Sequence, residues 1–83
     1  MAKRVRLISD VHIWLESHRS IATAEVIVSA VLGSPSSFRR QYEAHRFLIT
    51  LQRKVGSTKK RILIRVEETD DEFTVLLVHV EDW

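Results

Sequence analysis

Residues that interrupt helices and strands are scarce in this chain. Its 83 residues include two glycines, Gly33 and Gly56, one proline, Pro35, and no asparagine. So few breakers predict long regular elements joined by few loops. A chain of this length forms a single domain, residues 1–83, and buries only about 60% of the surface that its unfolded state exposes. The stability that it draws from its own core is therefore small.

The composition indicates a globular protein of the cytoplasm. Hydrophobic residues make up 45% of the chain and charged residues 29%, a mixture typical of folded domains. Cysteine is absent, which excludes disulfide bonds and thiolate zinc sites, and a secreted domain of this size would normally need such cross-links. No stretch approaches the ~18 apolar residues of a membrane span. We expect no cofactor, no bound metal and no membrane partner.

The first half of the chain carries one clear pattern and one ambiguous pattern. Across residues 4–16 apolar and polar side chains alternate, and a period of two predicts a half-buried strand. Residues 21–32 fit either a strand or a helix. The β-branched run 26–28 favours a strand, whereas Ser20 as an N-cap and Gly33 beyond the end fit a helix. We take the strand as the prediction and keep the helix as the alternative.

The middle of the chain predicts a long helix. Ser34 and Pro35 are typical of a helix start, because serine caps free amides and proline loses no hydrogen bond in the first turn. A broad apolar face follows and continues to Gly56, so we expect a helix of about 22 residues, or ~33 Å.

The end of the chain predicts a β-hairpin. Residues 62–66 and 73–80 are apolar, β-branched runs, and an acidic stretch separates them. We expect a four-residue loop over residues 69–72, because no glycine or asparagine is present for a tighter turn. The expected pairs are Val66 with Val75 and Ile64 with Leu77.

These elements combine into an α+β fold of the order ββαββ. One long helix packs on a four-stranded antiparallel sheet. If residues 21–32 are helical, the alternative order βααββ results, with two shorter helices. In that case residues 24–32, 33–35 and 36–46 resemble a helix-turn-helix, whose second helix would enter a groove of DNA.

One helix is too narrow to cover this sheet. Four strands span about 19 Å and a helix about 10 Å. The last strand is apolar on both faces, and the expected pairing turns part of it away from the helix. We therefore expect a second subunit, most simply in a homodimer, to cover these side chains. The predicted interface consists of Trp14, Leu63, Leu76, Val78 and Val80.

Basic side chains predict a second surface. Three arginines recur every seven residues on the expected helix and form a stripe about 21 Å long, which three further cations extend. Such a stripe can follow a phosphate backbone, independently of base sequence and with strong sensitivity to salt. The predicted nucleic-acid contacts are Arg39, Arg46, Arg53, Lys59, Lys60 and Arg61.

The sequence contains no recognisable catalytic motif. No glycine-rich loop is present to hold a phosphate, and no serine lies in a nucleophile elbow. We therefore expect a non-enzymatic binding or regulatory protein, a homodimer that acts on a protein partner through the apolar sheet face and the basic stripe. The alternative is a sequence-independent nucleic-acid-binding protein.

Overall fold

The computed structural model describes residues 3–33 and 39–82, which form two helices and five strands. The protein is α+β, as predicted, but its order is βααββββ and not ββαββ. The elements are β1 (Arg4–Leu7), α1 (Ser9–Ser17), α2 (Ala24–Gly33), β2 (Arg39–Glu43), β3 (Arg46–Val55), β4 (Thr58–Glu68) and β5 (Glu72–Asp82).

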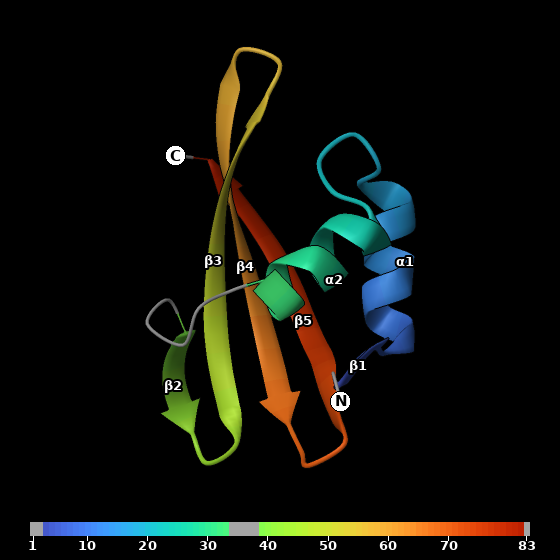
Figure 1. The fold of residues 1–83 in the computed structure, drawn as a ribbon. Coiled ribbons are helices and arrows are strands. Elements are labelled where there is room, and N and C mark those ends of the chain that lie inside the picture. The colour runs from blue at the N-terminus through green and yellow to red at the C-terminus, as the bar shows by residue number, and fades with distance from the viewer. Residues whose placement is uncertain (1–2, 34–38, 83) are drawn as a thin grey trace.

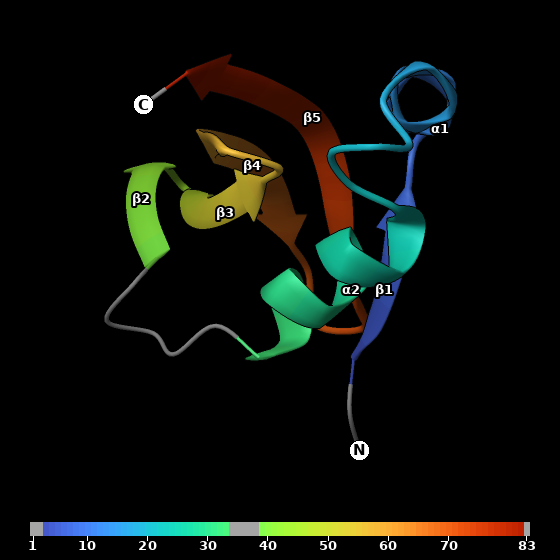
Figure 2. The same ribbon diagram turned by 90° about the horizontal axis from the view of Figure 1, so that it is seen from above.

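The five strands form one mixed sheet in the order β1-β5-β4-β3-β2. Neighbours from β2 to β5 are antiparallel, whereas β1 runs parallel to the start of β5, with Arg4 opposite Glu72 and Leu7 opposite Val75. In Figure 1, α2 lies in front of the sheet and α1 lies beside β5, past the end of β1; Figure 2 shows the same arrangement from above. Within the described residues neither helix covers the opposite face of the sheet, which we call the open face.

The core lies between α2 and the centre of the sheet. Ile27 and Val31 of α2 are four residues apart and fully buried, so one stripe of the helix faces the strands. Beneath them, Ile62, Ile64 and Val66 of β4 have 0% exposure. The same apolar cluster extends to both helices and to β3, β4 and β5, with the further buried members Val11, Leu15, Ala22, Phe47, Ile49, Phe73, Val75 and Val78.

Residues 21–32 contain helix α2, so the predicted strand is wrong there and the helical alternative is confirmed for this segment. The helix starts later than expected, because Thr23 rather than Ser20 receives the capping bond, from the Val26 amide to the Thr23 Oγ1 at 3.4 Å. Burial of Ile27 and Val31 outweighs the strand propensity of the β-branched run, since tertiary packing overrides such preferences.

The predicted strand over residues 4–16 is correct only as far as Leu7. Ser9–Ser17 form α1, and its buried residues are Val11 and Leu15. These two positions fit an i, i+4 helical spacing as well as the alternation of a strand. Ile13, which lies between them, is 63% exposed, as a helical period requires.

The predicted long helix is also wrong. Where it was expected, β2 and β3 form a hairpin, and in β3 the buried Phe47 and Ile49 alternate with Leu48 and Thr50 on the open face. The helix start predicted at residues 34–35 lies outside the described residues. Residues 39–46 contain strand in place of the second helix of a helix-turn-helix.

The C-terminal hairpin is confirmed, with one change of register. Val66 pairs with Val75 as predicted, but Ile64 pairs with Val78 instead of Leu77. The cause is a β-bulge at which Leu76 is an extra residue in β5, and one extra residue reverses the alternation beyond it. Val78 therefore faces the core at 3% exposure, while Leu77 lies on the open face at 45%.

The turn between β2 and β3 holds His45 at a φ of 63°, in the left-handed region. There a side chain costs about 1 kcal/mol, although histidine tolerates the region better than most residues. We expect His45→Gly to change the free energy of unfolding by less than about 1 kcal/mol, because relieved strain offsets the added freedom of the unfolded chain. His45→Val, which is β-branched, should lower it by about 2 kcal/mol. Urea unfolding measures both variants, and equal values would contradict the strain.

Candidate nucleic-acid interface

The β3–β4 hairpin carries the densest group of cations in the chain. Between Thr50 and Val66 the sequence contains no aspartate or glutamate. Gly56 and Ser57 form a two-residue turn, and Gly56 supplies a φ of +62° at the first turn position, where a type II′ turn requires it. The tip extends well beyond both helices (Figure 1). We call this segment the basic hairpin; its cations are Arg53, Lys54, Lys59, Lys60 and Arg61.

Like charges lie directly opposite each other in the basic hairpin. Arg53 pairs with Lys60 across the two strands, and Lys54 pairs with Lys59. Cations in opposite positions of an antiparallel pair repel each other and destabilise the sheet. The register at the tip therefore gathers positive charge at a cost to stability.

Within residues 3–33 and 39–82, acidic side chains of β5 form ion pairs with cations of β4 in this hairpin. The Lys60 ammonium pairs with the Asp82 carboxylate, and the Arg61 guanidinium lies 3.4 Å from the Glu81 carboxylate. β5 neighbours β4, so both ion pairs involve β4 cations. Arg53 and Lys54 on β3 are exposed, on the side of the hairpin away from β5. Lys54 is on the open face, whereas Arg53 is on the face that α2 covers and lines a hollow with Glu25.

The predicted arginine stripe does not form, because its segment consists of strands rather than a helix. Of the six predicted contacts, the structure brings four together in the basic hairpin: Arg53, Lys59, Lys60 and Arg61. Arg39 and Arg46 lie toward the other end of the sheet, and the seven residues from Arg46 to Arg53 span about 23 Å along β3. Lys54 was not among the predicted contacts, although it lies in a stretch of sequence that contains cations and no acidic residue.

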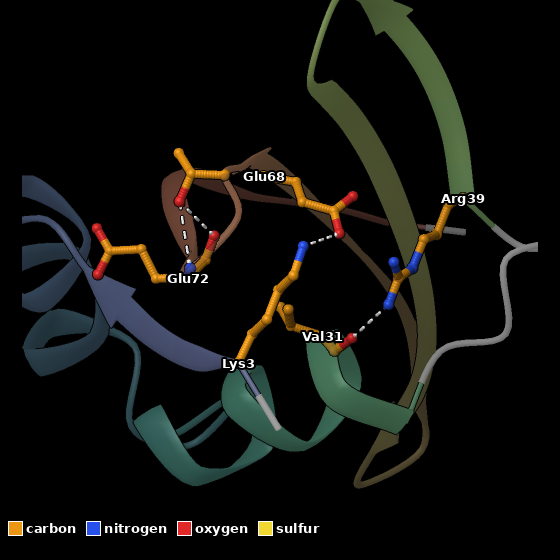
Figure 3. Close-up of polar contacts among 6 residues, drawn as sticks. Lys3, Val31, Arg39, Glu68 and Glu72 are labelled. Atoms are coloured by element: carbon orange, nitrogen blue, oxygen red, sulfur yellow. Dashed lines mark hydrogen bonds and ion pairs between the residues drawn. The ribbon is translucent and has the colours of Figure 1, made fainter. Parts of the chain in front are cut away.

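Arg39 is engaged in holding α2 to the sheet. Its guanidinium lies 4.8 Å from the centre of the Phe47 ring and 5.0 Å from that of Phe73, and it donates a hydrogen bond to the Val31 carbonyl at 3.2 Å (Figure 3). These contacts fix a cation over two aromatic rings at the C-terminal end of α2. The role that these contacts give Arg39 is to pack α2 against the sheet.

Arg46 belongs to the opposite, acidic end of the sheet. Its Nε donates to the Glu67 carboxylate at 2.9 Å, and Glu43 lies 3.5 Å from its guanidinium. The hydrogen bond to Glu67 and the charge of Glu67 raise the pKa of Arg46 above its ordinary value. Lys3 pairs with Glu68 at 2.5 Å in the same region (Figure 3).

Charge is thus separated along the molecule, whose longest extent is 39 Å. The basic hairpin forms one end, and the β4–β5 turn, with five carboxylates over residues 67–72, forms the other. Three of these five carboxylates are in ion pairs: Glu67 with Arg46, Glu68 with Lys3 and Glu72 with Arg6. The basic hairpin therefore provides the attraction for a polyanion.

Three of the five predicted interface residues, Trp14, Leu76 and Val78, line one hollow beside β5, whereas Leu63 and Val80 lie elsewhere. Val78 is buried, and Val80 packs against the core. Trp14, on α1, also packs against the core, and together with Leu76 and Val78 it lines this hollow. Leu63 is the member that lies on the open face, opposite His79 of β5. The expectation that Val78 and Val80 face away from the helices is wrong, because the bulge at Leu76 turns them inward.

Residues 3–33 and 39–82 contain no group of three His, Asp or Glu side chains placed to hold a metal ion. No helix among them is long and apolar enough to cross a membrane. A hollow of about 330 Å³ lies near the β2–β3 turn, and Arg39, Gln41, His45, Arg46, Phe47 and Glu68 line it.

Comparison with known proteins gives no further guidance about this interface. No family model, no curated protein and no solved structure matches the chain.

Proposed function

We propose that this protein is a non-enzymatic binding protein that recognises nucleic acid through the basic hairpin. The observation that carries the proposal is the pairing of like charges, Arg53 with Lys60 and Lys54 with Lys59, at the exposed tip. A polyanion that lies against the hairpin relieves this repulsion. Ligand binding therefore offsets the stability that the free protein loses to its like-charge pairs.

The charge distribution supports the same proposal. Phosphates attract cations without regard to base sequence, and the cations of the basic hairpin lie together at one end of the molecule. The contacts come from side chains on two strands rather than from a helix, so the recognition element is a β-ribbon. The location in the cytoplasm, predicted from a sequence without cysteine, remains part of this proposal.

A salt titration tests the proposal. Fluorescence anisotropy measures the binding of a labelled oligonucleotide at salt concentrations between 50 and 200 mM. This range is chosen because phosphate contacts weaken strongly across it. We expect the logarithm of the association constant to fall linearly with the logarithm of salt concentration. Five cation–phosphate contacts give a slope between about −3.5 and −4.5. Absence of binding at the lowest salt, or a flat dependence, would reject the proposal.

The homodimer acting on a protein partner remains a second candidate. Leu77 is 45% exposed on the open face, where it lies opposite Arg65 and diagonal to Leu63 of β4. Leu77 thus joins the predicted Leu63, in place of Val78 and Val80, among the apolar side chains that a partner subunit would cover. Sedimentation equilibrium at micromolar concentration measures this association, and a monomer would exclude it.

A further inference from the structure

The open face carries a track of cations that starts in the basic hairpin. Side chains alternate along β4, and Ile62 and Ile64 face the core. The odd-numbered residues of this strand therefore lie on the open face, where Lys59, Arg61 and Arg65 are separated only by Leu63. From Lys59 to Arg65 the track is about 20 Å long.

An aromatic ring lies at the far end of this track. Tyr42 of β2 is 42% exposed, and the Arg65 guanidinium lies 5.5 Å from the centre of its ring. Tyr42 and Arg65 come from strands that are not adjacent, since β3 lies between β2 and β4. The two planar groups therefore meet above the surface of β3. Nucleic-acid bases stack on both kinds of group, on tyrosine rings and on guanidinium planes.

The charge of the open face favours a polyanion over a second protein surface. Along the track β4 contributes three cations and no carboxylate. The acidic side chains at its margins, Glu67 and Glu81, are paired with Arg46 and Arg61. A dimer interface formed by this face would bring the cations of two copies together, and their repulsion opposes such an assembly.

The stacking surface also distinguishes single strands from duplexes. In a duplex the bases are stacked on one another, so their faces are inaccessible to a side chain that lies flat on a sheet. In a single strand each base presents a face, and a basic groove with an aromatic platform is the usual means of binding it.

We propose that the ligand of the basic hairpin is a single-stranded nucleic acid that continues across the open face. Its phosphates follow Lys59, Arg61 and Arg65, and one base stacks on Tyr42. This inference rests on the proposed function, because the hairpin supplies most of the charge. To the proposed function it adds that the ligand is single-stranded. It also adds one contact that depends on stacking against an aromatic ring rather than on charge.

The test compares two variants of Tyr42 on three ligands. Anisotropy at 50 mM salt gives the affinity for a 20-nucleotide oligo-dT, a 20-nucleotide oligo-rU and a 20-base-pair DNA duplex, all chosen as probes of strandedness. We expect both single strands to bind more tightly than the duplex. Tyr42→Ala should weaken single-strand binding about 10-fold, as the loss of one stacked base does, and should leave duplex binding unchanged. Tyr42→Phe, which keeps the ring, should bind like the unaltered protein.

Tighter binding of the duplex, or unchanged single-strand affinity of Tyr42→Ala, would overturn this inference and leave the proposed function standing. Absence of binding to all three probes would overturn both. A dimer that Leu77→Glu dissociates in sedimentation would show that a second copy covers the open face, and this outcome also contradicts the inference.

Discussion

Reversing two charges of the basic hairpin, in the variant Arg53→Glu/Lys54→Glu, is expected to lower nucleic-acid affinity about 100-fold at 50 mM salt. The variant removes two phosphate contacts and places two carboxylates beside the ligand. Its salt slope should be smaller in magnitude by about two, because about two fewer counterions are released. Anisotropy titrations measure both quantities.

The stability of the same variant should move in the opposite direction. The new carboxylates lie opposite Lys60 and Lys59 in the observed register, so two repulsive pairs become attractive pairs. Each cross-strand ion pair contributes roughly 0.2–1 kcal/mol. We therefore expect the free energy of unfolding to stay the same or to rise by about 1 kcal/mol. A loss of stability in urea unfolding would mean that the hairpin is not paired in this register.

A charge-matched variant controls for the change of net charge. Arg4→Glu/Arg19→Glu shifts the charge by the same amount, but Arg4 lies near the acidic end and Arg19 in the turn after α1, both exposed. If the hairpin is the interface, this variant should lose much less affinity than Arg53→Glu/Lys54→Glu. Equal losses would show that binding follows overall charge and would contradict the assignment of the hairpin.

Ile64→Ala is expected to cost about 3 kcal/mol of folding free energy. Ile64 lies on the central strand β4 with 0% exposure, so truncation leaves a cavity between the sheet and α2. A domain of this size has a total stability of roughly 4–12 kcal/mol, and the variant therefore loses a large fraction of it. Urea unfolding should show a midpoint lower by about 2 M with an unchanged slope.

Leu77→Ala is the matched control for this substitution. Leu77 is on the open face at 45% exposure, so removing its side chain should cost less than about 1 kcal/mol. If both variants lose the same free energy, Leu77 is buried in solution, and the open face is then covered by another molecule.

Local sequence signals predicted the C-terminal hairpin correctly. Two β-branched runs flank an acidic stretch, and the pair Val66 with Val75 follows from the loop between them. The grouping of Arg53 with residues 59–61 was also recognised, although the explanation differed. These cations were expected to extend a helix, whereas they gather because a two-residue turn at Gly56 folds β3 back onto β4.

Patterns with two valid periods misled the prediction. Val11 and Leu15 satisfy both a strand and a helix, and the β-branched run 26–28 forms part of α2 despite its strand propensity. In such segments packing against the rest of the core determines whether a helix or a strand forms. For α2 these are Ile27 and Val31, which pack over β4.

By itself the sequence determined an α+β chain with few breaks, a terminal hairpin and an acid-free basic segment, because each of these follows from neighbouring residues. Only the tertiary structure decided the bulge at Leu76, the parallel pairing of β1 with β5 and the position of Tyr42 over Arg65. Each of these requires a partner distant in sequence. A bulge in one strand cannot be located from the alternation of that strand alone, because it is defined by the pairing with the neighbouring strand. In β5 this pairing decides which valines are buried and which leucine is exposed.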